Sequence, residues 1–446
     1  MNGIGSHRLQ IDTDRAGGTS NPKTQTAGAN GKRSLLLTTD NRLLTLTADM
    51  KIFITGICGF VGSAIARRIR EVLPDSEVFG VDNLSRAGSE TNRRLAAYGI
   101  RTSHGDIRSA SDLENLPSAD WVVDAAAIPS VLAGVGNRSS SRQLVEHNLF
   151  GTVNVLEYCR RSHAGFILLS TSRVYAIRPL SELPLRVDGQ RFVPQFSTVE
   201  LVGVSPAGVS EEFSTAAPVS LYGATKLASE ALALEYGDTF GIPVWVNRCG
   251  VLAGAGQFGT AEQGIFSFWL HAWRERRPLR YIGFGGKGLQ VRDAFHPEDL
   301  ADLVLKQLQN SQRKPHRVCN VAGGIGQSMS LLELSKWCTE RFGPHQVASD
   351  AQERLFDIPW MVLDSTRAGT IWNWQPRRPL SSILAEIADH AEKNPNWLER
   401  TMEGGGKTGV EGRRQKAEDR VQEFRSSGVQ EFRNLGTANG EPRTVD

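Results

Sequence analysis

The chain has 446 residues, of which 40 % are hydrophobic, and its formal net charge is +3. This length allows two domains with a sizeable core, and the nearly balanced charge gives no reason to expect a nucleic-acid partner. No apolar run approaches the roughly 20 residues that a membrane span needs, and no apolar signal core opens the chain, so we expect a cytoplasmic protein without a membrane partner.

The two ends differ from the body in composition. Residues 1–49 are rich in Gly, Thr, Asn and Ser, and we expect a disordered extension apart from a short apolar element at 35–46. Residues 401–446 are Gly-rich and charged and repeat Val-Gln-Glu-Phe-Arg, which indicates a disordered tail or a brief amphipathic helix. The five cysteines include no Cys-x-x-Cys pair, so we expect reduced thiols and no metal site.

Short apolar segments alternate with longer amphipathic segments between these ends. The expected strands are 51–55, 77–81, 121–125, 166–170, 244–247 and 318–321. The expected helices include 62–72, 144–161, 222–240 and 297–309. Short buried strands that alternate with helices indicate an α/β fold with a doubly wound, Rossmann-type parallel sheet. Such sheets bind ligands at the carboxyl ends of their strands.

A glycine-rich loop follows the first expected strand, with Gly56, Gly59 and Gly62 three residues apart and Phe60 between the last two. We expect Gly56 to permit a tight turn, Gly59 to let the backbone approach a pyrophosphate, and Gly62 to let the helix lie close to the strand. The helix N-terminus would then offer free N–H groups to the phosphates. The alternative is that these glycines only shape a turn.

One carboxylate follows the second expected strand, and another stands at position 106. Asp82, beside Asn83, stands about twenty residues beyond the glycine loop, where it can accept hydrogen bonds from ribose hydroxyls and favours NAD over NADP. Asp82 could instead form a turn, and the nearby Arg86 could accept a 2′-phosphate. We expect Asp106 to meet the adenine amine and Ile107 to lie against the ring, with a helix cap as the competing role of Asp106.

The apolar segment 166–170 ends in three hydroxyl residues, Ser170, Thr171 and Ser172. Any of the three could hydrogen-bond a reacting sugar oxygen at the carboxyl end of this strand, and spacing alone does not choose among them. Hydroxyl side chains also commonly satisfy backbone groups at strand ends.

Tyr222 and Lys226 are four residues apart in an expected helix and would share a face. A nearby ammonium favours phenolate, so we expect Lys226 to lower the pKa of Tyr222 from about 10 toward neutral pH. Tyr222 could then remove a proton from a sugar hydroxyl while a hydride leaves the same carbon. The alternative is an aromatic ring that packs on a lysine stem.

Two arginines are candidates for holding a substrate diphosphate, because a guanidinium pairs two phosphate oxygens at once. They are Arg292 and Arg248, each of which could instead pair with a protein carboxylate or face solvent. The Pro-containing segment 176–217 has few helix signals, and we expect it to cover the sugar.

Taken together, residues 50–400 resemble the extended short-chain dehydrogenase/reductases that modify nucleotide sugars. The similar segments are 55–62, 81–84, 105–107, 148–152, 170–175, 222–226 and 290–293. The finer pattern is similar to that of nucleotide-sugar epimerases in the family. It comprises 170–175, 256–258, 263–264, 290–296 and the long segment between Tyr175 and Tyr222.

This resemblance implies roles for individual residues. Tyr222 would be the acid/base, Thr171 its hydroxyl partner, and Lys226 would hold the nicotinamide ribose. Asn148 would lie near the sugar and cofactor, and Gln257 near the substrate. Ala126, in a segment that departs from the family pattern, would lie near the cofactor.

The resemblance also implies an activity: NAD-dependent epimerisation of a nucleotide-diphosphate sugar, by transient oxidation to a ketone and hydride return to the opposite face. The substrate would be CDP-paratose or CDP-tyvelose, altered at C2. A UDP-sugar 4-epimerase, a reductase and a non-catalytic NAD-binding module are the alternatives. Related dehydratases carry Asp-Glu after the catalytic threonine, whereas this chain has Ser172-Arg173, which disfavours dehydration.

The same resemblance implies a domain organisation and an assembly. We expect an NAD-binding domain with the catalytic residues at 50–249, and a smaller C-terminal substrate-binding lobe at 250–400 from which residues 318–321 return to the sheet. A homodimer or homotetramer would form through the helices at 144–161 and 222–240.

Overall fold

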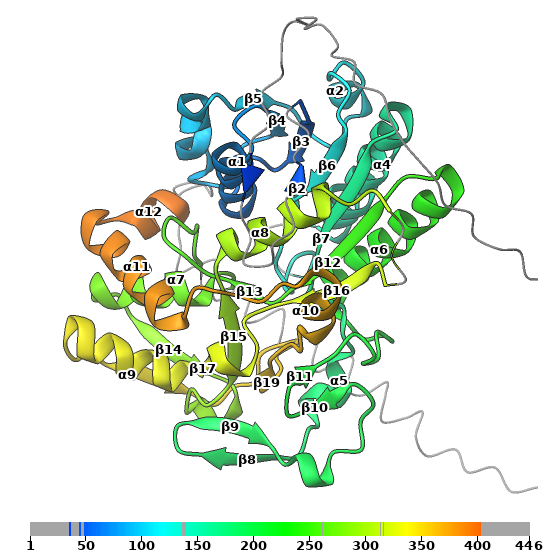
Figure 1. Cartoon of the computed structure of the whole chain (residues 1–446). Coiled ribbons are helices and arrows are strands. Elements are labelled where there is room, and N and C mark those ends of the chain that lie inside the picture. Colours follow the sequence, from blue (N-terminus) through cyan, green and yellow to red (C-terminus); the bar gives the residue numbers. More distant parts are fainter. Residues whose placement is uncertain are drawn as a thin grey trace, which may run out of the picture. The chain divides into compact units, whose positions relative to one another are not determined.

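The structure, a computed structural model, describes residues 35–36, 44–45, 49–135, 140–260, 262–312, 314 and 316–402 (Figure 1). It divides into two units, Met1–Thr45 and Leu46–Asp446. In the first unit, β1 (Leu35–Leu36) pairs antiparallel with β2 (Leu44–Thr45). The other predictions about the N-terminal extension and about residues 403–446 lie outside the described residues.

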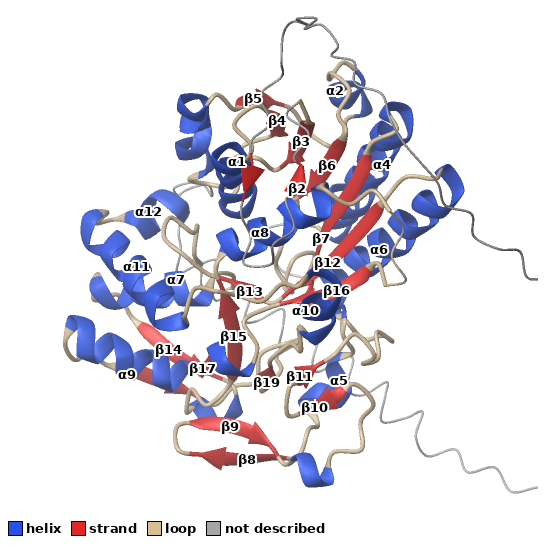
Figure 2. Ribbon diagram, in the orientation of Figure 1, coloured by secondary structure: helices blue, strands red, loops and turns tan. Residues whose placement is uncertain are grey.

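A seven-stranded sheet forms the centre of the second unit, and every pairing in it is parallel (Figure 2). Its strands are β3 (Lys51–Thr55), β4 (Glu77–Asp82), β5 (Arg101–His104), β6 (Trp121–Asp124), β7 (Gly165–Thr171), β12 (Val244–Cys249) and β16 (Val318–Val321). The spatial order is β16-β12-β7-β6-β3-β4-β5. The chain therefore winds outward from β3 in both directions, which confirms the doubly wound prediction.

Helices cover both faces of this sheet, because successive strand residues point to opposite sides and both sides are apolar. On one face, Ile52 and Ile54 of β3 share a core with Ile65 and Val304. That core is covered by α1 (Phe60–Val72), α8 (Pro297–Leu308) and α10 (Thr366–Trp372). On the other face, Phe53 shares a core with residues of α2 (Ala110–Glu114), α4 (Gly151–Ser162) and α6 (Ser220–Phe240).

The π-helical turn Glu146–Phe150 joins α3 (Ser141–Val145) to α4, so the helix predicted at 144–161 is one continuous helical stretch with a bulge. None of the described helices is both long enough and apolar enough to span a membrane.

A second group of elements, here called the smaller lobe, packs around its own core. Its strands are β13 (Val251–Leu252), β14 (Leu279–Ile282), β15 (Val291–Phe295), β17 (Ser328–Ser330), β18 (Val347–Asp350) and β19 (Trp360–Met361). Its helices are α7 (Ile265–Arg274), α9 (Leu331–Phe342), α11 (Leu380–Lys393) and α12 (Trp397–Met402). Trp269, Leu334 and Ile387 are buried together between these helices.

The segment 176–217 packs against the smaller lobe. It contains α5 (Ile177–Ser181), β8 (Leu185–Asp188), β9 (Arg191–Pro194), β10 (Val204–Ser205) and β11 (Gly208–Val209). The N–H of Val209 donates to Val362 O (2.8 Å), and the N–H of Asp364 donates to Val209 O (2.9 Å). No residue of this fully described segment lines the ligand cavity, so the prediction that it covers the sugar is wrong.

Candidate active site

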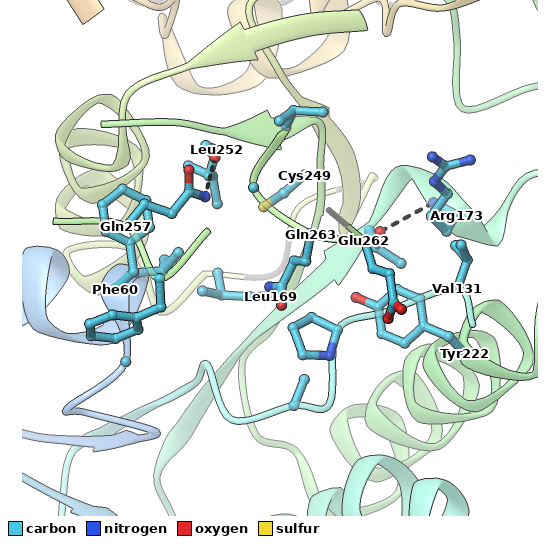
Figure 3. A pocket seen from close by; sticks show the side chains of 18 of the residues that line it. Phe60, Val131, Leu169, Arg173, Tyr222, Cys249, Leu252, Gln257, Glu262 and Gln263 are labelled. Carbon is cyan, nitrogen blue, oxygen red and sulfur yellow. Dashed lines mark hydrogen bonds between the residues drawn. The ribbon is translucent and has the colours of Figure 1, made fainter. Parts of the chain in front are cut away.

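A cavity of about 460 Å³ lies at the carboxyl ends of the central strands. The main sheet and its helices contribute residues from Gly56 to Cys249 to its wall, and the smaller lobe contributes residues from Gly250 to Asp357. Figure 3 shows side chains from both sources around the same space. A ligand in this cavity would therefore contact the main sheet and the smaller lobe together.

The glycine loop between β3 and α1 forms one part of this wall, with Gly59 and Phe60 exposed to the cavity. Gly56 has φ +61°, and a Cβ there would lie 2.9 Å from Ala126 Cα. A Cβ on Gly62 would lie 2.3 Å from Gly56 O, so glycine is required for α1 to begin this close to the loop. Because the first turn of α1 has no acidic residue, its positive end fits the pyrophosphate of a dinucleotide.

Asp82 ends β4 and lines the cavity together with Asn83. Its carboxylate accepts hydrogen bonds from the N–H groups of Cys58 (3.0 Å) and Leu84 (2.8 Å). Burial raises the pKa of this carboxyl, and these hydrogen bonds act in the opposite direction. The position fits the predicted ribose contact and also holds the glycine loop against the end of β4.

Asp106 does not line the cavity, although the next residue, Ile107, does. The Asp106 carboxylate pairs with Arg108 (2.6 Å) and accepts a hydrogen bond from Asn83 Nδ2 (3.0 Å). The bond to Arg108 lowers the pKa of Asp106 well below its usual range. The Asp106 carboxylate thus already has partners within the protein. Of the two residues predicted to contact adenine, only Ile107 lines the cavity.

Thr171 and Tyr222 both line the cavity wall, and the Thr171 hydroxyl acts to lower the pKa of the phenol. Thr171 ends β7, and Tyr222 lies in the first turn of α6. The two elements approach closely because residue 223 is glycine: a Cβ there would lie 2.2 Å from Arg173 O. Of the three hydroxyl residues, Thr171 is therefore the partner of the tyrosine.

The electrostatics of Tyr222 differ from the prediction. Burial raises the pKa of Tyr222 to about 12, while the bond from Thr171 and the positive charge of Arg173 act in the opposite direction. Lys226 is 2 % exposed and does not line the cavity. Burial lowers the pKa of Lys226, and Asp124 and Glu230 oppose this. The pKa of Tyr222 is therefore raised, not lowered toward neutral pH as expected; the effect of Lys226 on this pKa and the contact of Lys226 with ribose stay predictions.

Asn148 is buried away from the cavity wall. Its Oδ1 accepts a hydrogen bond from the N–H of Ile128 (2.8 Å), and its Nδ2 donates to Ile128 O (3.2 Å) and to Thr225 (3.3 Å). It therefore joins the loop after β6 to α6, rather than lying against the sugar as predicted.

Arg248 also lies outside the cavity wall, so the structure does not place it at the predicted diphosphate contact. Its Nε and Nη2 donate to the Glu230 carboxylate (3.1 and 2.7 Å), and its guanidinium stacks on Tyr175 at 5.2 Å. Burial lowers the pKa of Arg248, but the pairing with Glu230 outweighs this effect and raises it. Arg248 is a structural cation.

Arg292 and Gln257 do line the cavity. Arg292 Nη2 donates to Asp357 Oδ1 (2.8 Å), so it fits the predicted anion-binding role with a protein carboxylate at its side. Gln257 Nε2 donates to Leu252 O (2.8 Å), as the dashed line in Figure 3 shows, and its buried Oε1 has no hydrogen-bond partner in the described chain.

Arg354 and Asp357 are among the cavity residues that sequence reasoning missed, and Arg173 was treated only as a departure from the family pattern. Arg354 and Asp357 lie in an irregular segment before β19, where neither periodicity nor glycine spacing marks a site. Arg173 follows Thr171 by two residues, and that proximity was the available signal.

Comparisons with known proteins agree with this geometry. The model of the NAD dependent epimerase/dehydratase family matches residues 52–322. The CDP-paratose 2-epimerase of Salmonella typhi is 28 % identical over 334 residues, which is 74 % of this chain and 95 % of that protein. A dTDP-glucose 4,6-dehydratase of Escherichia coli is 25 % identical over 384 residues, covering 81 % of this chain and 98 % of the relative.

Solved structures share the fold. The UDP-glucuronic acid 4-epimerase of Bacillus cereus, in complex with UDP-glucuronic acid and NAD, superposes with a TM-score of 0.61 at 23 % identity, covering 77 % of this chain and 99 % of that one. The UDP-glucose 4-epimerase of Thermotoga maritima, solved with UDP-glucose, gives the same TM-score, identity and coverage.

Proposed function

This chain belongs to the NAD dependent epimerase/dehydratase family, and we propose that it is an NAD-dependent epimerase of a nucleotide-diphosphate sugar. The observation that carries the proposal is that Thr171 and Tyr222 line the same cavity as the glycine loop, with the Thr171 hydroxyl acting to lower the pKa of the phenol. The cofactor, when bound, supplies the acceptor and the donor of the hydride.

Tyr222 and Thr171 transfer and stabilise the proton of the sugar hydroxyl. Tyr222 as phenolate takes the proton of a sugar hydroxyl, and Thr171 donates to the same oxygen or to the phenolate. Because both side chains are fixed by β7 and α6, the resulting ketone can turn in the pocket while these groups keep their places. When the hydride returns to the other face, Tyr222 gives the proton back, and the carbon is inverted without net oxidation.

Dehydration is disfavoured at this site. Ser172 and Arg173 follow Thr171 and line the cavity, so the positions that carry Asp-Glu in related dehydratases have no carboxylate here. A guanidinium is a poor proton acceptor because it stays protonated at neutral pH. The dehydratases among the relatives therefore support the fold and the cofactor, but not the outcome of the reaction.

For the substrate we propose CDP-paratose or CDP-tyvelose, with inversion at C2. The support is the likeness to the Salmonella enzyme over nearly its whole length, together with the segments 256–258 and 290–296. The test incubates the purified chain and NAD with CDP-tyvelose, CDP-paratose, UDP-glucose and UDP-glucuronic acid, and follows products by NMR and reduced nicotinamide by absorbance.

We expect the two CDP-sugars to interconvert without net formation of reduced cofactor. If only a UDP-sugar is inverted, the proposed CDP-sugar substrate is wrong, but the proposed epimerase activity stands. Stoichiometric use of reduced cofactor, or no inverted sugar at all, would overturn the proposal.

We also propose a homodimer or homotetramer built through α4 and α6. Phe150, just before α4, is 56 % exposed, and Leu221 and Phe240 on α6 are 40 % and 44 % exposed. Light scattering during size-exclusion chromatography tests this, and a monomer would overturn it.

A further inference from the structure

Four charged side chains converge on one wall of the cavity: Arg173, Arg292, Arg354 and Asp357, here called the arginine cradle. Arg173 lies in the short 3-10 turn Ser172–Val174 that follows β7, and the other three come from the smaller lobe. Among these four described residues, Arg292 pairs with Asp357 at 2.8 Å. One carboxylate beside three guanidinium groups leaves an excess of positive charge within the cradle, while the carboxylates of Asp82 and Glu262 lie elsewhere in the cavity lining.

Arg173 is the member of the cradle that lacks a full set of partners. Its Nη1 atom is shielded from solvent and makes no hydrogen bond within the part of the chain that the structure describes. Burial lowers the pKa of Arg173 to about 10, and the positive charges of Arg292 and Arg354 act in the same direction. The guanidinium is still charged at neutral pH. Its Nη1 is therefore a charged hydrogen-bond donor without an acceptor, and shielding such a donor from water is costly.

Arg248 provides the contrast within the same chain. Arg248 is a buried arginine beside β7, and Glu230 and Tyr175 accept hydrogen bonds from its donors. The protein thus supplies hydrogen-bond acceptors for Arg248. It supplies none for Nη1 of Arg173, where a bound ligand could provide one.

We propose that Arg173 is a substrate-binding residue that takes an oxyanion of the substrate in the arginine cradle. This inference rests on the proposed function, which supplies the nucleotide-diphosphate sugar. In CDP-paratose or CDP-tyvelose the only such oxyanion is an oxygen of the diphosphate. If the sugar is instead a uronic acid, its carboxylate is the other source, since a guanidinium forms the same paired hydrogen bonds with both.

The backbone of Arg173 connects this binding to the catalytic group. Its N–H donates to Thr171 Oγ1 (3.2 Å), and its carbonyl oxygen packs against Gly223, next to Tyr222. Figure 3 shows the guanidinium extending away from the Tyr222 ring. An anion bound by Arg173 would therefore lie at a fixed position relative to the hydroxyls of Thr171 and Tyr222. The positive charges of Arg292 and Arg354 in the smaller lobe would help to neutralise it.

The test is calorimetric titration of the NAD-loaded enzyme and of Arg173→Gln and Arg173→Lys with CDP, UDP, UDP-glucose, UDP-glucuronic acid and the uncharged nucleosides. Arg178→Gln is the matched control, because Arg178 is exposed and pairs with Glu182 one turn further along, at the end of the same helix α5. Thermal unfolding confirms that each variant is folded.

We expect Arg173→Gln to weaken binding of the charged ligands ~10- to 100-fold, Arg173→Lys to weaken it less, and the nucleosides to bind as before. A loss with CDP and UDP identifies the diphosphate, and a loss confined to UDP-glucuronic acid identifies the sugar carboxylate. Unchanged binding of every charged ligand by Arg173→Gln, or an equal loss with the nucleosides, overturns the inference. If the wild type epimerises no sugar but these losses appear, the proposed function fails and the binding role stands.

Discussion

The carbonyl oxygen of Arg173 packs directly against Gly223, where a Cβ would lie only 2.2 Å away. This contact brings the end of β7 against the first turn of α6 and so places Thr171 beside Tyr222. The two elements can come this close only because residue 223 has no side chain. Adding one at Gly223 therefore tests how the distance between the Thr171 and Tyr222 hydroxyls affects catalysis.

Gly223→Ala should separate the two hydroxyls. The added methyl group must displace either the turn that carries Arg173 or the start of α6, and small misplacements of reacting groups cost about 100-fold in rate. We expect kcat to fall by about that factor while the affinity for NAD stays within about twofold. Gly326→Ala is the control, because nothing lies within 4 Å of a Cβ there. Wild-type kcat in Gly223→Ala would contradict the packing argument.

The pH profile should report on Tyr222. Since burial raises the pKa of its phenol to about 12, the phenolate fraction is small at neutral pH and increases tenfold with each pH unit below that value. We expect kcat/KM to rise with pH from about 7 toward 10. In Tyr222→Phe, kcat/KM should fall about 100- to 10,000-fold and the rise should vanish. An unchanged profile in that variant would assign the base to another residue.

The cofactor preference should depend on Asp82. Asp82→Asn removes the negative charge that disfavours a 2′-phosphate and weakens acceptance of ribose hydrogen bonds. We expect the ratio of the dissociation constants for NADP and NAD to fall at least about tenfold, measured by quenching of tryptophan fluorescence. Asp75→Asn, at an exposed position, is the control and should leave the ratio unchanged. An unaltered ratio in Asp82→Asn would show that Asp82 does not contact the ribose.

Arg248→Met should affect stability rather than substrate binding. The change leaves the buried Glu230 carboxylate without its cation, and breaking a buried pair in this way costs about 3–5 kcal/mol. Urea unfolding measures the loss, and KM for the nucleotide sugar should stay within about twofold. Arg178→Met, which breaks an exposed pair, should cost less than about 1 kcal/mol. A large rise in KM with unchanged stability would return Arg248 to the substrate site.

The sequence predicted the main sheet well because six of its strands are buried on both faces and read as apolar runs. The strand β5 was missed, since Arg101–His104 is polar and lies at the edge of the sheet, where no apolar pattern is required. The glycine loop was predictable in detail, because its spacing depends on backbone contacts that only glycine allows.

The arginines show where sequence reasoning stops. Arg248 and Arg292 occupy similar places at or near strand ends, but one faces Glu230 and the other faces Asp357 at the cavity wall. Each partner is far away in the chain, so only the fold could assign the roles. Asp106 differs, because its partner Arg108 is two residues away and could have been weighed from the sequence. The high pKa of Tyr222 follows from burial, which spacing does not reveal.

The central claim is that a hydride leaves one carbon of a nucleotide sugar and returns to the other face of the same carbon. The most direct measurement supplies the NAD-loaded enzyme with CDP-tyvelose that carries deuterium at C2 and analyses the product by NMR and mass spectrometry. The account predicts CDP-paratose with deuterium retained at C2, no incorporation of solvent hydrogen and no net reduced cofactor. Inverted product that has exchanged its deuterium for solvent hydrogen would contradict it.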